Sequence, residues 1–221
     1  MSKTYVIDTE TTGNEPPECI ELAWLEYGQV GIRVERFKPT HKSGYGALSI
    51  HHILPFELDA CRPSAEAKLP SDASYIVGHN IDYDWEVLGK PPVKRICTLA
   101  IARSLYPELD SHKLGAMYYR MCGVSEAARR DLQDAHSAAA DVLLCVKILQ
   151  AMLLDRAPQH SLLQPEALWK FSEQCRIPQV MTFGKHKGKP VGMVDTGWIK
   201  WYRAQPDTDP YLLQAFKNAG K

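Results

Sequence analysis

Short runs of β-branched and aromatic residues, separated by turn-forming residues, mark the first half of the chain. They predict strands over residues 5–7, 20–26 and 31–37, with a turn near Gly28 between the second and the third. A further apolar run over residues 75–77 ends at Gly78 and predicts another strand. Three early strands in hairpin order favour a mixed sheet. The segment between them and the fourth strand, about 38–71, is rich in loop-forming residues.

Apolar residues at spacings of three and four predict helices in the middle of the chain. The predicted helices cover residues 82–88, 98–105, 113–121 and 137–154. The last is the clearest, because it is rich in alanine and places an apolar stripe on one face, made by Val142, Cys145, Val146, Leu149 and Leu153. Helices that follow short strands in this way predict an α/β fold, in which helices flank a mixed sheet.

Length and composition limit the classes of protein that remain. The 221 residues are 45% hydrophobic and 24% charged, which is typical of a globular protein with one well-packed domain and a small appendage. No apolar run approaches the ~20 residues that span a membrane, and the N-terminus lacks a signal pattern. Six scattered cysteines without zinc-binding spacing are expected to be reduced thiols. These features predict a cytoplasmic protein without a membrane partner.

Charge is unevenly distributed, although the formal net charge is zero. From residue 157 onward nine Lys and Arg face five Asp and Glu, whereas the preceding residues carry 17 against 21. We expect a main domain over residues 1–156, a linker region over 157–178 and a small basic and aromatic module over 179–221. A basic tail behind an acidic body is a pattern found in proteins that bind nucleic acid.

Three acidic motifs carry candidate chemistry. Asp8 and Glu10 end the first strand two residues apart, so alternation places both on one face, where their repulsion would be relieved by cations. Asp84 lies one turn into a predicted helix that Asn80 can cap. His136 and Asp141 lie at the start of the alanine-rich helix. Each motif alone also fits an ordinary role, as a solvated strand end, a helix cap or a favourable acid in a first helical turn.

Together and in this order, the three motifs resemble those of the DEDD exonuclease superfamily, in its DEDDh branch. The resemblance covers roughly residues 4–154 and rests on the blocks at 8–13, 79–84 and 136–141, with shorter matches at 47–53, 97–100 and 113–114. The family pattern places an aromatic residue directly before the second acid. Tyr83 has that place, which selects Asp84 rather than Asp82. The histidine five residues before Asp141, instead of a tyrosine four before it, indicates the branch.

The resemblance implies a ribonuclease H-like fold and a 3′–5′ exonuclease that hydrolyses phosphodiester bonds with two Mg²⁺ ions, which Mn²⁺ can replace. The implied metal ligands are Asp8, Glu10, Asp84 and Asp141, with Asp8 bridging the two ions, and His136 is the implied general base. Carboxylates suit this chemistry, because Mg²⁺ prefers hard oxygen ligands. Two bound cations would also allow an acidic body to bind an acidic substrate.

DNA with a free 3′ end is the expected partner, and the sequence indicates no oligomeric state. The candidate nucleic-acid contacts follow the acidic motifs and the basic, aromatic C-terminal segment, and they comprise Thr11, Thr12, Gly13, His79, Asn80, Lys185, Lys187 and Trp198. The tryptophans equally fit a small core of the C-terminal module. Two alternatives stay open, namely an exoribonuclease of the same superfamily and a non-catalytic nucleic-acid-binding protein on a nuclease fold.

Overall fold

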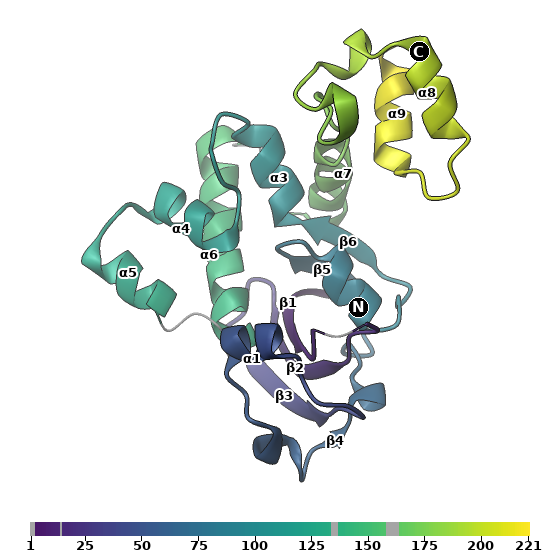
Figure 1. Cartoon of the computed structure of the whole chain (residues 1–221). Coiled ribbons are helices and arrows are strands. Elements are labelled where there is room, and N and C mark those ends of the chain that lie inside the picture. The colour runs from purple at the N-terminus through teal and green to yellow at the C-terminus, as the bar shows by residue number, and fades with distance from the viewer. Residues whose placement is uncertain (1–2, 14, 134–136, 158–163) are drawn as a thin grey trace.

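A mixed six-stranded sheet forms the centre of the molecule (Figure 1). The computed structural model describes residues 3–13, 15–133, 137–157 and 164–221. The sheet order is β4-β3-β2-β1-β5-β6. The strands are β1 (Lys3–Thr11), β2 (Cys19–Glu26), β3 (Arg33–Lys38), β4 (Arg62–Pro63), β5 (Ala73–Gly78) and β6 (Lys94–Cys97). The predicted α/β class with a mixed sheet is confirmed, and the four predicted strands correspond to β1, β2, β3 and β5.

Strand β1 lies at the centre and pairs in both senses. It runs antiparallel to β2, with Glu10 opposite Glu21, and parallel to β5, with Val6 opposite Val77. β3 continues the antiparallel side, and β6 continues the parallel side. The carboxyl ends of β1 and β5 therefore meet at one edge of the sheet, where the acidic motifs follow.

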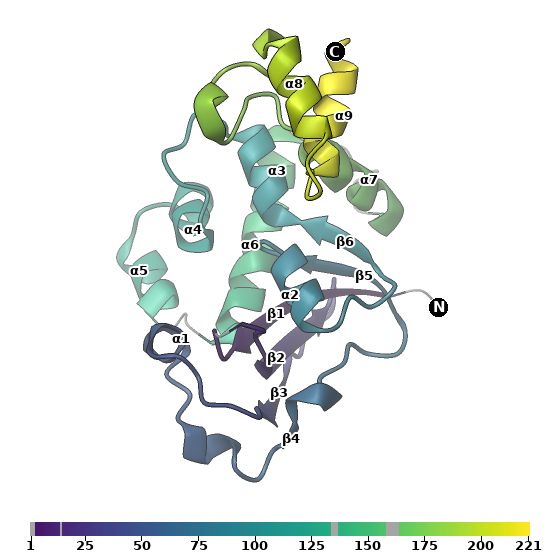
Figure 2. The same cartoon turned by 45° about the vertical axis from the view of Figure 1, so that its right-hand side comes forward.

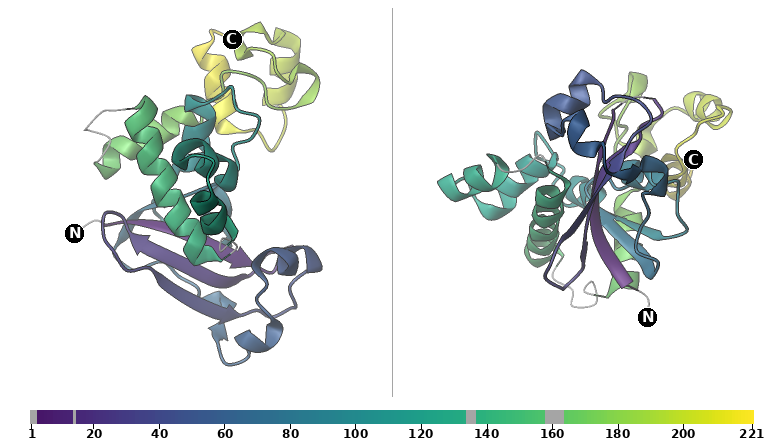
Figure 3. Two further views of the ribbon diagram at one scale, coloured as in Figure 1. Left: turned by 90° about the vertical axis from the view of Figure 1, so that its left-hand side faces the viewer. Right: turned by 90° about the horizontal axis from the view of Figure 1, so that it is seen from below.

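Helices cover both faces of the sheet (Figure 3). Their bounds are α1 (Tyr45–His51), α2 (Asp82–Val87), α3 (Thr98–Leu105), α4 (Leu114–Cys122), α5 (Glu126–Gln133), α6 (Ala138–Arg156), α7 (Pro165–Cys175), α8 (Thr196–Arg203) and α9 (Pro210–Asn218). On one face α3, α4 and α6 bury a core with Val6 and Val77. On the other face α2 packs against Tyr5 and Ile7. The alternation of β1 thus assigns its even-numbered residues to the face of α6.

The segment predicted as a linker contains helix α7, which packs on β6 and α3 (Figure 2). Its Leu168 belongs to the main core, and the hydroxyl of Ser172 accepts a hydrogen bond of 2.8 Å from the backbone N–H of Cys97. Lys94 on β6 forms an ion pair with Glu166 and lies over the ring of Trp169. These contacts attach α7 to the main body. The division into domains stays a prediction.

The C-terminal residues form a small helical unit with an apolar cluster of its own. Eight buried side chains make this cluster, namely Met181, Val191, Val194, Ile199, Tyr202, Leu212, Ala215 and Phe216. Helices α8 and α9 lie beside α7 and away from the sheet (Figures 1 and 2). Among the residues that the structure describes, no helix is long and apolar enough to cross a membrane.

Candidate active site

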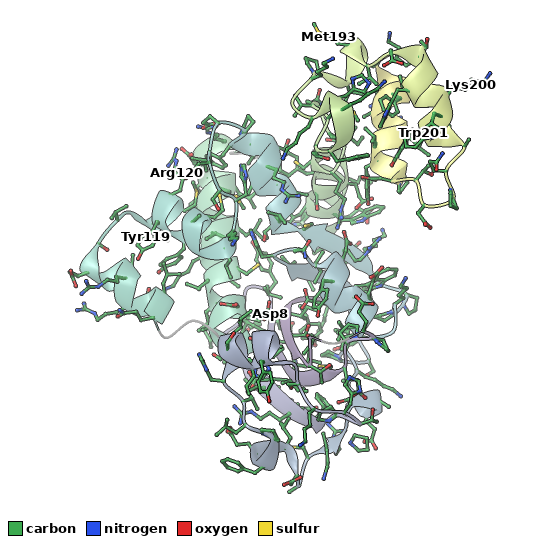
Figure 4. All side chains as sticks on the ribbon, in the orientation of Figure 1. Asp8, Tyr119, Arg120, Met193, Lys200 and Trp201 are labelled. Atoms are coloured by element: carbon green, nitrogen blue, oxygen red, sulfur yellow. The ribbon has the colours of Figure 1, made fainter. Side chains whose placement is uncertain are left out.

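The carboxyl end of β1 presents Asp8 and Glu10 toward helix α6. Both side chains are half-buried, and they share the face of the sheet on which Val6 joins the core beneath α6. Asp8 lies near the middle of the molecule, between the lower end of α6 and the sheet (Figure 4). The predicted placement of these two acids on one face therefore agrees with the strand geometry.

Asp84 reaches the same edge of the sheet from the first turn of α2. Its side chain is only 5% exposed. One carboxylate oxygen, Oδ1, accepts hydrogen bonds from the backbone N–H of Thr9 at 2.9 Å and from the hydroxyl of Thr9 at 2.7 Å. Thr9 lies between the two acids of β1. These two bonds fix the Asp84 carboxylate against β1, beside Asp8 and Glu10.

Asp82, two residues earlier, points elsewhere. It forms ion pairs with Arg95 on β6 and with Arg176, whose Nη1 lies 2.5 Å from Oδ2. The Arg176 side chain is only 6% exposed, so the pair joins the segment after α7 to the main body. Asp82 therefore has a structural role, which supports the selection of Asp84 as the site residue.

Asp141 enters the site from the first turn of α6. Ser137 caps this helix, because its hydroxyl accepts a hydrogen bond of 3.3 Å from the backbone N–H of Ala140. Asp141 is half-buried, and its charge contributes to the raised pKa values of Asp8, Glu10 and Asp84. The predicted general base, His136, lies outside the described residues.

Burial and mutual repulsion shift the pKa values of three of these acids upward. Burial raises the pKa of Glu10 to about 8, with further contributions from Asp141, Glu21 and Asp84. Burial also raises the pKa of Asp84 to about 7, although the hydrogen bonds from Thr9 oppose the shift. The pKa of Asp8 is raised well above its ordinary range by burial and by the neighbouring acids. Within the described part of the chain, no Lys, Arg or His forms an ion pair with Asp8, Glu10 or Asp84.

The chemistry of this donor set fits divalent cations that prefer oxygen ligands. Four carboxylates from β1, α2 and α6 lie at one edge of the sheet, and such ions would offset the burial and the repulsion that raise the pKa values of three of them. Among the described residues, no three His, Cys, Asp or Glu side chains are yet close enough to hold one ion. A bound cation would have to draw the carboxylates closer together.

Glu21 is a fifth acid at this site, and the sequence motifs did not identify it. It lies opposite Glu10 on β2, is only 2% exposed, and pairs with Arg36 at 2.8 Å. A signal was present in the sequence, because a single acid interrupts the apolar run Cys-Ile-Glu-Leu-Ala-Trp-Leu over residues 19–25.

The residues that follow Glu10 are held by hydrogen bonds and close packing. The Thr11 hydroxyl forms a hydrogen bond of 2.8 Å with that of Tyr83, and the Thr12 hydroxyl accepts one of 3.1 Å from the backbone N–H of Glu18. Gly13 is exposed at φ +68°, and an added Cβ would lie 2.6 Å from that of Ala47, so both conformation and space require glycine there. Of these three predicted nucleic-acid contacts, Gly13 is the accessible one.

His79 and Asn80 line a cleft of about 560 Å³ beside α2. The Nε2 of His79 lies 2.8 Å from the carbonyl oxygen of His112, and its Nδ1 lies 3.0 Å from the hydroxyl of Thr98. Burial lowers the pKa of His79 to about 4, so the ring is neutral at pH 7. His79 thus ties the loop before α4 to the end of β5, whereas Asn80 is exposed at the mouth of the cleft.

Two exposed cations, Arg103 and Lys113, line the same cleft, and the sequence motifs gave them no role. They come from α3 and from the residue before α4, which are separated along the chain. Only the folded chain brings them together with Asn80. With Asp110 also in its lining, the cleft carries two cations against one acid.

In the C-terminal module, Lys185 and Lys187 are exposed, whereas Trp198 is packed among other aromatic rings. Trp198 stacks on Tyr202 with ring centroids 5.3 Å apart and an interplanar angle of 5°. Trp201 is 55% exposed. Trp198 therefore contributes to the core of the module, and Trp201 offers the more accessible ring for stacking.

The whole chain also resembles one bacterial enzyme of the superfamily, and comparison with known proteins bears this out. Over 208 residues it is 26% identical to exodeoxyribonuclease 10 of Escherichia coli K12, covering 89% of this chain and 88% of the relative. The chain is similar to exodeoxyribonuclease X. The same identity and coverage hold for exodeoxyribonuclease 10 of Escherichia coli O6:H1 strain CFT073. The predicted resemblance is confirmed, although no family model matches the chain.

Solved structures agree with the predicted fold. A structure of exonuclease X in complex with 5′-overhanging duplex DNA matches with a TM-score of 0.59 and 21% identity, covering 76% of this chain and 99% of that one. The zinc-bound complex of Escherichia coli exonuclease I with single-stranded DNA matches with a TM-score of 0.56 and 20% identity. This match covers 77% of this chain and 42% of exonuclease I. The ribonuclease H-like fold predicted from the resemblance to the DEDD exonuclease superfamily is thereby confirmed.

Proposed function

We propose that this protein is a 3′–5′ exodeoxyribonuclease that releases nucleoside 5′-monophosphates from DNA 3′ ends, with a role in DNA repair. The similarity to exodeoxyribonuclease 10 supports the reaction class and the substrate. The observation that carries the proposal is that Asp8, Glu10, Asp84 and Asp141 lie at one edge of the sheet, where burial and then mutual repulsion raise the pKa values of the first three. Such a group of acids is unfavourable unless cations offset it.

Asp8, Glu10, Asp84 and Asp141 would hold two divalent cations, Mg²⁺ or in its place Mn²⁺. When bound, such ions activate a water molecule and stabilise negative charge on the phosphate and the leaving oxygen. The chain supplies the fixed frame for this chemistry. Thr9 orients the carboxylate of Asp84, and the cap of α6 at Ser137 fixes the helical turn that carries Asp141. His136, the residue before that cap, would accept the proton of the attacking water.

The cleft lined by Asn80, Arg103 and Lys113 would bind the DNA backbone near its 3′ end. Exposed guanidinium and ammonium groups bind phosphate oxygens, and Asn80 lies four residues before Asp84. The two cations of the cleft would offset the negative charge of the main body where the DNA strand approaches the site. We place the enzyme in the cytoplasm, because its six cysteines are free thiols and its proposed substrate is DNA.

A time course on matched DNA and RNA oligomers tests the substrate. Both carry a 5′ label and the same sequence, and both are incubated with Mg²⁺ or with a chelator. We expect the DNA to shorten one nucleotide at a time from its 3′ end with Mg²⁺, and to stay intact in the chelator. Faster shortening of the RNA would assign the protein to the exoribonucleases instead, since only a contact to the 2′-hydroxyl separates the two substrates.

A further inference from the structure

Three charged residues lie in one row across the sheet beside the acidic site. Glu10 on β1 is opposite Glu21 on β2, and Glu21 is opposite Arg36 on β3. Directly paired residues of antiparallel strands point to the same face, with Cβ atoms about 5 Å apart. The order in the row is therefore acid, acid, base, and Glu21 lies between the site acid Glu10 and the guanidinium of Arg36.

Glu21 is held by contacts to two other parts of the fold. Its Oε2 lies 2.8 Å from Nε of Arg36, and its Oε1 accepts a hydrogen bond of 3.3 Å from the backbone N–H of Ala138. Ala138 is the first residue of α6, the helix that carries Asp141. Glu21 therefore connects the start of α6 with the third strand of the sheet.

A buried acid at this position has an electrostatic cost. Repulsion from Glu21 contributes to the raised pKa values of both Asp8 and Glu10. An amide of the same shape could accept the hydrogen bond from Ala138 without this repulsion. The negative charge of Glu21 therefore needs another explanation than the attachment of α6.

The ion pair with Arg36 explains the negative charge of Glu21. It is 39% exposed and reaches Glu21 through Nε and Glu57 through Nη1, at 2.8 and 2.9 Å. A guanidinium has five N–H donors, so Arg36 can keep Glu57 and still bind a further carboxylate. If Glu21 lacked its charge, the next carboxylate in the row would be Glu10.

We propose that Glu21 is a positioning residue that keeps Arg36 away from Glu10, so that Glu10 is free to bind a cation, while it holds the start of α6. This inference rests on the proposed function. An ion pair between Arg36 and Glu10 would compete directly with a metal ion for the same carboxylate. The charge of Glu21 thus costs some repulsion at the site and prevents this competition.

Three variants separate this role from a purely structural one. They are Glu21→Gln, which removes the charge and keeps the acceptor for Ala138, Arg36→Gln, and the double variant that carries both changes. Mn²⁺ binding to each full-length protein is measured by electron paramagnetic resonance of the free ion, without substrate, and the melting temperature is measured in parallel. Cleavage of DNA by the wild type is measured as well.

We expect Glu21→Gln to raise the Mn²⁺ concentration for half-saturation by about two- to fivefold, the size typical of one half-exposed ion pair. The double variant should return to within about twofold of the wild type, because the competing cation is gone. Arg36→Gln alone should bind Mn²⁺ at least as tightly as the wild type. A purely structural ion pair would instead give equal losses for both single variants and no rescue.

Unchanged Mn²⁺ binding by Glu21→Gln, or a double variant as weak as Glu21→Gln, would overturn the inference while the proposed function stands. If the melting temperature shows that Glu21→Gln does not fold, Arg36→Gln still decides, because weaker binding by this variant contradicts the proposal. A wild type that neither binds Mn²⁺ nor cleaves DNA would refute the proposed function, and the inference with it.

Discussion

Asp82 and Asp84 lie on one helix two residues apart, yet their surroundings differ completely. Asp84 is buried against Thr9 at the acidic edge of the sheet, whereas Asp82 pairs with Arg95 and Arg176. The spacing alone could not distinguish the two acids. The aromatic residue at position 83 selected Asp84 through the family resemblance, and the contacts of the folded chain give the physical reason for the choice.

Substitution of the two acids should have opposite consequences. Asp84→Asn should lower kcat by orders of magnitude and leave the melting temperature unchanged or slightly higher, because the amide oxygen can still accept the bonds from Thr9 while a repelling charge is removed. Asp82→Ala should retain cleavage and lower the melting temperature by about 2–6 °C, since it leaves the buried Arg176 without this partner. Steady-state kinetics and thermal melts of both variants give the answer. If the substitution at Asp82 abolished activity and the one at Asp84 did not, Asp82 would be the site residue instead.

The raised pKa of Glu10 predicts how the metal-free protein responds to pH. Its pKa is about 8 in the folded state and near 4.5 in the unfolded state, so the folded state binds more protons between these values. The free energy of unfolding should therefore fall as the pH rises from about 4.5 to 8. Glu10→Gln should reduce this fall, leaving the variant more stable than the wild type at pH 8, by about 1–2 kcal/mol. Urea denaturation in chelator at pH 5 and pH 8 measures the free energy of unfolding of both proteins. An equal change in this free energy between the two pH values would contradict the raised pKa of Glu10.

At the scale of secondary structure, the sequence predicted the strands that carry the site, and helix α6, with good accuracy. Strong apolar patterns identify β1, β5 and α6, because these elements are buried. The short strand β6, helix α1 and helices α5 and α7 were not predicted. β6 has four residues and follows two prolines, and the exposed faces of α5 dilute its apolar signal. The row of Glu10, Glu21 and Arg36 was not predicted. It depends on the register between paired strands, which the apolar pattern within each strand does not define.

Helix α7 gives a prediction at this scale. A chain truncated after residue 178 keeps α7 and its contacts to β6, and we expect it to fold and cleave DNA. A chain truncated after residue 162 loses the buried Leu168 and the acceptor for the N–H of Cys97, so its melting temperature should be clearly lower. Thermal melts of the two truncated proteins measure the contribution of α7 to the stability of the main body. Equal melting temperatures would show that α7 contributes nothing to the stability of the body.

At the scale of the whole molecule, the basic module and the acidic site are separate. Lys200 and Trp201 lie on α8, at some distance from Asp8 and beyond α3 and α7 (Figure 4). These two residues of the module therefore lie away from the acidic edge of the sheet. Its lysines and its exposed tryptophan suit contact with DNA away from the 3′ end. The sequence indicated the composition of this module, but the roles of its two tryptophans follow from their packing, since Trp198 is in the core and Trp201 is exposed.

Removal of the charges of the module should weaken binding more than chemistry. Changing Lys185, Lys187 and Lys189 together to Ala should raise KM more than it lowers kcat, and should reduce the slope of log Kd against log salt by about 2. Trp201→Ala should weaken binding equally at all salt concentrations, whereas the matched change Trp198→Ala should lower the melting temperature. Fluorescence anisotropy over a salt series measures these effects. Identical salt slopes for the triple variant and the wild type would exclude the module as a DNA-binding surface.

The proposed activity depends on the acidic edge of the sheet, where four carboxylates would bind the cations that drive hydrolysis. The most direct test compares the wild type with Asp8→Asn under single-turnover conditions, on 5′-labelled single-stranded DNA with Mg²⁺. We predict a ladder that shortens stepwise from the 3′ end with the wild type, and intact DNA with Asp8→Asn, although the variant melts at the same temperature or higher. Cleavage by Asp8→Asn at the rate of the wild type would contradict the account.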